Sequence, residues 1–427
     1  MTPTLHLCLL LAWFCAFAYS HHHPDHQHDH DDHKDKQETH AGAPPSKNMT
    51  CHKIAPSNAD FAFRFYKQIA AEAPAKNVFF SPVSISTAFA MLTLGAKSTT
   101  QSQIYEGLAF NLTEIEEQEI HEGFRHFIQM FSLSDREILL NMGNALFIDE
   151  KLKPIPKFLD DIKSFYASEG FSSNFTDSAE AEKQINDYIK KKTKGEIVDL
   201  VKNLGPDTVM VLVNYILLKG KASYWEHPFN YEATREEDFF VDGKTSVKVD
   251  MMNRDSRYNS LHDEELSCSV VELPYKGNVA ALFILPDEGK MKQVEDALSV
   301  EVLTRLEKSL RKERYFFNLY IPRFSISGTY DVKEIFRRMG VTEVFTNQAD
   351  LSGITGSPEL KVSRAIHRAH LNVHENGTEA SATTVIELIP ASIPPVLKVN
   401  RPFLFSIVDK TAHSVLFMGK VVNPTEK

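Results

Sequence analysis

The sequence predicts one large α+β domain in which helices gather early and strands late around large β-sheets. Apolar residues recur at helical spacing in the first half of the chain, whereas apolar runs of strand length dominate the second half. The 427 residues are 42% hydrophobic and 24% charged, which suits a globular protein with a large core. Neither an internal repeat nor a central linker divides the chain, so a single domain over 51–427 is the simplest interpretation.

Five segments of the first half have the periodicity of helices. In 59–70 the residues Phe61, Phe65 and Ile69 recur every fourth position. The segment 84–94 is apolar on all sides, and we expect a buried helix that begins at Ser84. The other three segments are amphipathic and span 115–130, 155–166 and 179–192.

The pattern changes to that of strands after residue 208. The apolar run 209–218 indicates a strand that is buried on both faces. Shorter strands are expected at 269–273, 279–285, 317–321 and 403–408.

The first fifty residues are not expected to belong to the domain. An apolar run at 7–17 is too short to span a bilayer and ends in the small residues Ala18 and Ser20. We therefore expect residues 1–20 to be a secretory signal and the product to be extracellular. Residues 21–50 form a polar tail that is expected to be disordered. No later run is apolar enough for a transmembrane helix, so no membrane partner is expected.

The tail is rich in histidine and aspartate, which raises the question of a metal site. Imidazole suits zinc or copper, but the histidines of 21–33 follow no fixed ligand spacing. We expect a solvated tail with weak metal affinity, no specific metal site and no cofactor.

Two cysteines and four sequons bear on the expected extracellular location. Cys51 and Cys268 remain after the signal is removed, and the sequence leaves open whether they pair. Asn-x-Thr sequons suit a secreted glycoprotein. They begin at Asn48, Asn111, Asn174 and Asn376.

Residues 375–395 combine a strand-like arm with a proline-rich tip. With period two, one face of the arm is uncharged, whereas the other carries Glu379 and Glu387. Prolines then hold Ala391 and Ser392 in an irregular segment that a protease can attack. An ordinary strand followed by a loop fits the same pattern. The uncharged face consists of Thr378, Ala380, Ala382, Thr384, Ile386 and Leu388.

Charge and motifs argue against two other classes of function. The net charge of −10, without a basic excess, argues against a nucleic-acid partner. The chain contains no Gly-x-Ser-x-Gly elbow, no His-Glu-x-x-His motif and no glycine-rich phosphate loop, so we do not expect an enzyme.

Several long segments across 51–427 resemble clade A of the serpin family, the group of alpha-1-antitrypsin and kallistatin. They include 79–85 (FFSPVSI), 184–188 (QINDY), 349–353 (ADLSG) and 416–424 (LFMGKVVNP). The ending of the arm, IPASIPP at 389–395, resembles the reactive-centre loop of that group. The resemblance implies a serpin fold of about nine helices around three β-sheets, with an exposed reactive-centre loop at about 375–395.

The resemblance also implies a mechanism, in which a monomer inhibits a trypsin-fold serine protease. The protease cleaves Ala391–Ser392 and forms an acyl-enzyme, and the freed arm inserts into the main sheet as a strand. The fifteen residues 377–391 span roughly 50 Å when extended, enough to cross a sheet. Insertion requires small, uncharged residues on the inward face. The implied hinge consists of Glu375, Gly377, Thr378, Ala380, Ala382 and Thr384.

The residue before the scissile bond sets which protease is inhibited. Alanine at 391 fits the small primary pocket of elastases, so an elastase-like target is expected. The alternatives are a chymotrypsin-like protease that cuts after Leu388, a tissue-kallikrein-type protease, or a non-inhibitory carrier of a small hydrophobic ligand.

The resemblance assigns further residues to the sheet that must open. Glu375 and Arg323 match an ion pair at the top of the inserting strand, and Trp225 matches the tryptophan of the family's breach region just below it. A polar cluster beneath the sheet, the shutter, is matched by Ser81, Ser84, Asn214 and His367.

Three features bear on how closely the chain follows its family. The residues Ala222, Ser223 and Tyr224 look like an insertion before Trp225. The sequon at Asn376 lies in the hinge, and we expect it to be largely unmodified because a glycan there would slow insertion. A basic cluster lies where kallistatin has its heparin site, but adjacent glutamates favour a solvated charged surface over heparin binding. The cluster consists of Lys308, Arg311, Lys312 and Arg314.

Overall fold

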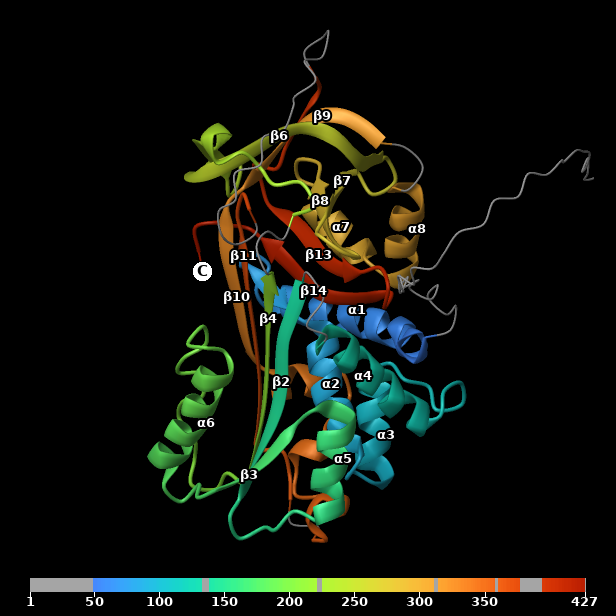
Figure 1. The fold of residues 1–427 in the computed structure, drawn as a ribbon, viewed down its shortest axis with the longest axis vertical. Helices are drawn as coiled ribbons and strands as arrows, with labels where there is room; N and C mark the ends of the chain where they lie inside the picture. Colours follow the sequence, from blue (N-terminus) through green and yellow to red (C-terminus); the bar gives the residue numbers. More distant parts are fainter. Residues whose placement is uncertain are drawn as a thin grey trace, which may run out of the picture. The chain divides into compact units, whose positions relative to one another are not determined.

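Two β-sheets organise the protein in this computed structural model (Figure 1). The structure describes residues 49–132, 138–220, 225–310, 314–357, 360–376 and 394–426. The expected signal, nearly all of the tail and most of the expected reactive loop therefore lie outside the described residues. Lys47–Lys427 form one compact unit.

The smaller sheet has five strands in the order β10-β11-β4-β2-β3. β11 and β4 are parallel to one another, while β10 and β2 run antiparallel to them on either side. The strands are largely apolar because helices cover both faces. Their bounds are β10 (Phe324–Asp331), β11 (Arg364–Val373), β4 (Met210–Gly220), β2 (Ile138–Asp149) and β3 (Glu169–Ser173).

The larger sheet has nine strands in the order β1-β14-β13-β8-β7-β6-β9-β12, with β5 paired to β6. The strand β6 is 18 residues long; it pairs with β5 and β9 in its first part and with β7 in its last part. The resemblance implied three β-sheets, whereas the described residues form two hydrogen-bonded sheets. The bounds are β1 (Val78–Phe80), β5 (Arg235–Phe240), β6 (Ser246–Asp263), β7 (Cys268–Pro274), β8 (Val279–Pro286), β9 (Arg314–Pro322), β12 (Val396–Lys398), β13 (Phe403–Asp409) and β14 (Ser414–Val421).

Ten α-helices lie in the described ranges, and the α+β class is confirmed. In Figure 1, α6 lies on one face of the five-stranded sheet and α2 to α5 lie on the other. The five helices predicted from the sequence are present within a few residues. Their bounds are α1 (Ala55–Glu72), α2 (Pro82–Thr93), α3 (Ser98–Gly107), α4 (Glu117–Ser132), α5 (Pro156–Tyr166), α6 (Ser178–Lys192), α7 (Met291–Ala297), α8 (Val300–Leu310), α9 (Val332–Arg338) and α10 (Ser352–Thr355).

The start of α2 corrects one expectation. The helix begins at Pro82 and not at Ser84, because the Ser81 side chain caps it by accepting a hydrogen bond from the Ser84 N–H. Proline at the first helical position fits this arrangement, since its missing N–H needs no partner there.

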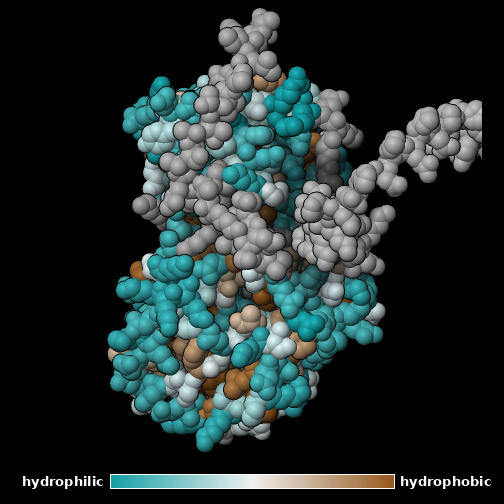
Figure 2. Space-filling view, in the orientation of Figure 1, coloured by the Kyte–Doolittle hydropathy of each residue, from teal (hydrophilic) through white to brown (hydrophobic). Residues whose placement is uncertain are grey.

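The remaining cysteines are buried in separate apolar clusters, and no disulfide joins Cys51 to Cys268. Burial raises the pKa of the Cys268 thiol to about 12. None of the described helices is long and apolar enough to cross a membrane, and hydrophilic residues make up much of the coloured surface in Figure 2.

Candidate functional site

The candidate site is the seam where β4 and β11 meet in the middle of the five-stranded sheet. The two strands pair directly, from Arg364 opposite Val211 to His370 opposite Leu217. The chain runs from the end of β11 through His374, Glu375 and Asn376 into 377–393. A segment that folded back from β11 into the seam would be antiparallel to both strands, and antiparallel pairing is slightly more stable than parallel pairing.

The four residues matched to the shutter lie together beneath the seam. His367 and Asn214 are opposite one another on β11 and β4, and their side chains form a hydrogen bond. The Asn214 amide donates to the Ser84 hydroxyl oxygen at 2.7 Å. The Ser81 N–H donates to Nε2 of His367 at 3.1 Å. The cluster therefore ties both strands of the seam to each other and to the start of α2.

His367 is held in its neutral form. The side chain is 1% exposed, and burial lowers its pKa from 6.5 to about 3. Because Nε2 accepts from the Ser81 N–H, Nδ1 carries the proton and donates it to the Asn214 oxygen. Both ring nitrogens are thus engaged by neighbouring groups of the fold, and the imidazole acts as a structural link across the seam.

The pKa of His367 leads to a prediction about stability and pH. The unfolded chain binds a proton below about pH 6.5 while the folded chain does not, so unfolding becomes easier as the pH falls. We expect this residue to lower the free energy of unfolding by about 1.4 kcal/mol for each pH unit between about pH 6 and pH 4. Urea unfolding of His367→Gln should show a shallower decline over this range, and an equal decline in both proteins would contradict the prediction.

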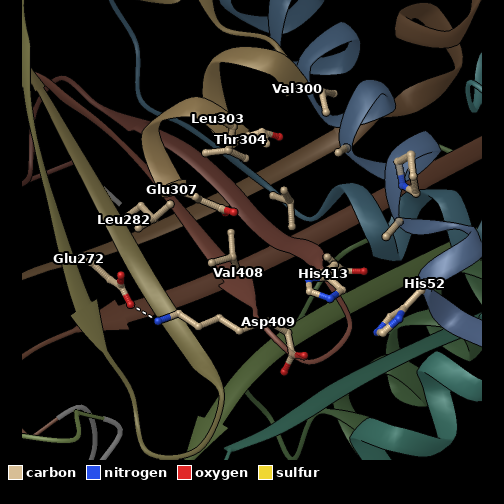
Figure 3. A pocket seen from close by; sticks show the side chains of 16 residues that line it. His52, Glu272, Leu282, Val300, Leu303, Thr304, Glu307, Val408, Asp409 and His413 are labelled. Atoms are coloured by element: carbon tan, nitrogen blue, oxygen red, sulfur yellow. Dashed lines mark hydrogen bonds and ion pairs between the residues drawn. The ribbon is translucent and has the colours of Figure 1, made fainter. Parts of the chain in front are cut away.

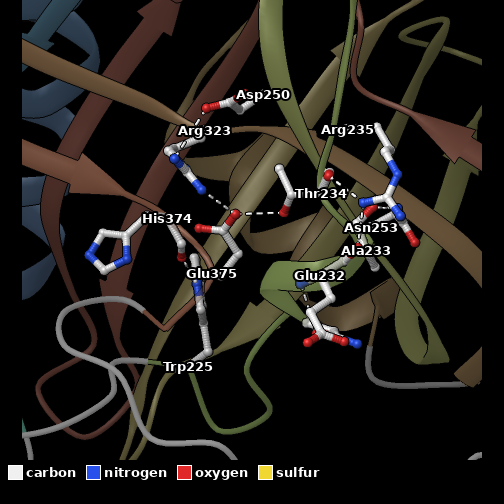
Figure 4. Close-up of polar contacts among 11 residues, drawn as sticks. Trp225, Glu232, Ala233, Thr234, Arg235, Asp250, Asn253, Arg323, His374 and Glu375 are labelled. Carbon is white, nitrogen blue, oxygen red and sulfur yellow. Dashed lines mark hydrogen bonds and ion pairs between the residues drawn. The ribbon is translucent and has the colours of Figure 1, made fainter.

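The upper end of the seam is held by Glu375, as Figure 4 shows. Its carboxylate accepts hydrogen bonds from Arg323 at 2.6 Å and from the Thr234 hydroxyl at 2.5 Å. Its backbone carbonyl accepts from the Phe229 N–H at 3.0 Å. Burial opposes ionisation of Glu375, but the bonds from Arg323 and Thr234 outweigh it and leave the pKa below its usual value. Glu375 is 2% exposed and is thus a fixed point from which the chain continues.

Trp225 holds the neighbouring backbone. Its indole N–H donates to the His374 carbonyl at 2.9 Å, and its ring stacks on Tyr275 with 4.4 Å between centroids. The side chain is 2% exposed. The residues 221–224, which include the expected insertion, lie outside the described residues.

Removing the charge of Glu375 should destabilise the protein. Arg323 also pairs with Asp250 at 3.1 Å, but Asp250 is half exposed and Glu375 is buried. We expect Glu375→Gln to lower the free energy of unfolding by about 2 kcal/mol, because a partly buried cation loses its better partner. The matched change Asp250→Asn should cost under about 1 kcal/mol. Urea unfolding at neutral pH compares the two, and similar losses would argue against a special role for Glu375.

The remaining predicted residues are distributed over the surface. Lys308 and Arg314 are exposed at the end of α8 and the start of β9, whereas Arg311 and Lys312 lie outside the described residues. Of the sequons, Asn111 and Asn174 are exposed, Asn376 is partly exposed and Asn48 is outside the described residues. No group of three metal-ligating side chains occurs in the described part of the chain.

Several site residues were missed from the sequence. Asn144 on β2 lies opposite Asn214 and accepts a 2.6 Å hydrogen bond from it, which extends the shutter across a third strand. Its signal was a polar residue directly before the apolar stretch 145–148. Thr234 and Asp250 carry no local signal, since they meet Glu375 and Arg323 only through tertiary pairing.

A separate cavity of about 410 Å³ lies between α1, α8 and the larger sheet (Figure 3). Along α8 the wall carries the apolar side chains of Val300 and Leu303 next to the polar Thr304 and Glu307. The side chains of His52 and His413 also line the cavity. Two glutamates also line it. Glu272 is ion-paired to Lys410, while the carboxylate of Glu307 points towards the interior of the cavity in Figure 3.

Comparison with known proteins decides the family. The family model described as "Serpin (serine protease inhibitor)" matches residues 56–424. The chain belongs to the serpin family. Alpha-1-antiproteinase 2 of Equus caballus is 52% identical over 422 residues, which cover 98% of both chains. Alpha-1-antitrypsin of Sus scrofa is 52% identical over 89% of both chains. The expected resemblance to clade A serpins of the alpha-1-antitrypsin type is thereby confirmed.

Solved serpin structures share the same fold. Human glycosylated kallistatin is 46% identical and superposes with a TM-score of 0.83 over 89% of this chain and 100% of its own. Human thyroxine-binding globulin in complex with thyroxine is 42% identical, with a TM-score of 0.83 over 88% and 100%. The serpin fold is therefore established for this chain.

Proposed function

We propose that this serpin is a secreted inhibitor that traps elastase-like serine proteases by inserting residues 377–391 between β4 and β11. The observation that carries the proposal is the direct parallel pairing of β4 with β11. A strand that continues from β11 after Glu375 can turn back and insert between these two strands. The high identity to alpha-1-antiproteinases over nearly the whole chain supports the same activity.

The proposed chemistry begins at the Ala391 carbonyl. The protease serine oxygen attacks the carbonyl carbon, the Ala391–Ser392 bond breaks, and the protease histidine protonates the leaving amine of Ser392. An ester between Ala391 and the protease remains. Insertion of the freed arm at the seam carries the protease along before water can hydrolyse this ester. In the inserted state the His367–Asn214 bond is replaced, since a strand then separates the two residues.

The test is to mix the purified protein with neutrophil elastase and to run a denaturing gel. A band near the summed masses that survives boiling in detergent is the expected result. Cleavage at Ala391–Ser392 without such a band would overturn the trapping mechanism. Trypsin serves as the control protease, because no Lys or Arg precedes the expected scissile bond and trapping should be slow.

The cavity of about 410 Å³ supports a second candidate, carriage of a small hydrophobic ligand. Its volume lies in the range of pockets that bind drug-sized molecules, and the similar thyroxine-binding globulin is solved in complex with thyroxine. The glutamates and histidines of the wall make it more polar than a simple hydrophobic site. Isothermal titration with thyroxine tests this candidate: saturable heat supports it, and no heat at micromolar protein removes it for this class of ligand.

A further inference from the structure

Val396 is an exposed apolar side chain on a short edge strand. Its exposed fraction is 58%, which only Tyr231 exceeds among the large hydrophobic residues of the described chain. Its strand, β12, has three residues and pairs with β9 at the end of the larger sheet. Pro395, directly before it, is exposed as well. Exposed apolar groups on an edge strand favour association with other chains, so their presence here calls for an explanation.

Two aromatic residues of β9 lie on the same face as Val396. The register places Val396 opposite Asn318. Phe316 and Tyr320 lie two residues to either side of Asn318, so their side chains share its face, and both are partly exposed. Such diagonal neighbours on adjacent strands are roughly 7–8 Å apart, within reach of aromatic side chains. Phe316, Tyr320 and Val396 therefore form one apolar surface, which we call the edge patch.

Charged residues surround the edge patch. On one side, the exposed Arg257 of β6 lies opposite Phe316. On the other side, the ammonium of Lys398 lies 4.5 Å from the centre of the Tyr320 ring and forms an ion pair with Glu237 at 2.6 Å. An apolar centre that contains aromatic residues and has a polar rim is the usual anatomy of a protein–protein interface.

The edge patch is held in place by its backbone. The Asn318 N–H donates to the Pro395 carbonyl at 2.8 Å, and the Val399 N–H donates to the Tyr320 carbonyl at 2.9 Å. These bonds fix β12 to β9 on both sides of Val396. A surface that is already ordered loses little conformational entropy when a partner binds to it.

The position of the edge patch along the chain identifies its partner. Val396 follows Ala391, the expected site of cleavage, by five residues. Five residues span at most roughly 18 Å, whereas a globular protease of about 230 residues has a radius of roughly 20 Å. A protease bound at Ala391–Ser392 therefore extends over the edge patch. This step rests on the proposed function.

We propose that the edge patch is a docking surface for the target protease, which contacts it beside the active site on the side of the leaving chain. The contact forms when the protease binds, before the acyl-enzyme, so it raises the rate of association and leaves the trapped fraction unchanged. Val396 is thus a specificity-determining residue. It favours proteases with an apolar surface at this place, because a charged surface would lose hydration against the patch without gaining a partner.

A pair of matched valine substitutions tests the proposal. Val396→Ser is compared with Val198→Ser, since Val198 is 52% exposed and follows α6, which lies towards the opposite end of the molecule from β9 (Figure 1). The measurement is the second-order rate constant for complex formation with neutrophil elastase. Val396→Ser should lower it about three- to tenfold, while Val198→Ser should leave it unchanged. Both variants should melt like the wild type, because both changes are on the surface.

The ratio of detergent-stable complex to cleaved chain separates docking from insertion. Val396→Ser should keep the wild-type ratio. An unchanged association rate in Val396→Ser, an equal fall in both variants, or a fall in the trapped fraction alone would overturn the proposal. If the wild type forms no stable complex, it is the proposed function that fails. Docking is then still tested by the rate at which elastase cleaves each variant.

Discussion

Ala382→Arg is expected to convert the protein from an inhibitor into a substrate of elastase. Ala382 lies in the middle of the uncharged face, which must pack on the buried side of the sheet, where Leu371 and Ala369 of β11 are at most 3% exposed. An arginine there would bury an unpaired charge and cost several kcal/mol. Insertion would then be slower than hydrolysis of the ester, and the trapped fraction should fall at least about tenfold.

The measurement is the ratio of detergent-stable complex to cleaved protein on a gel. Ser381→Arg is the matched control, because it places the same charge one residue away on the opposite face of the arm, the face that already carries Glu379 and Glu387. It should trap elastase nearly as well as the wild type. Equal trapping by Ala382→Arg would mean that this face of the arm does not enter the sheet.

Ala391→Arg is expected to redirect the inhibitor from elastase to trypsin. The primary pocket of trypsin contains an aspartate that pairs with arginine, whereas that of elastase is too small for it. We expect the second-order rate constant for trypsin to rise, and that for elastase to fall, by about a hundredfold or more. Ala391→Val keeps a small apolar residue and should leave elastase as the target.

Rates of complex formation with the two proteases, measured under pseudo-first-order conditions, test the position of the scissile bond. Unchanged trapping of elastase by Ala391→Arg would show that cleavage occurs elsewhere in the loop. Leu388→Ala would then test the alternative that a chymotrypsin-like protease cleaves after Leu388.

Parts of the fold were predictable where local patterns are strong. The helices at α1, α4, α5 and α6 have one apolar face, and the spacing of that face is visible in a short window. β4 and β8 were equally clear because a strand buried on both faces is apolar over most of its length, although β4 also carries Asn214. β6 was missed because buried and exposed residues alternate only weakly along it, and because its length results from pairing with three other strands.

The residues of the site were likewise predictable only in part. The resemblance supplied Ser81, Ser84, Asn214 and His367, and the structure brings all four together. It did not supply Asn144 or Thr234, because their roles depend on side chains far away in the sequence.

The sequence by itself determined the class of the fold, the family and the two-faced arm at 375–395, because periodicity and motifs are properties of neighbouring residues. Only the tertiary structure decided that β4 pairs with β11 and that Glu375 is fixed by Arg323 and Thr234. Each of these joins residues far apart in the chain. Whether a charge or a hydrogen-bonding atom has a partner depends on which distant strands meet, and no local pattern encodes that pairing.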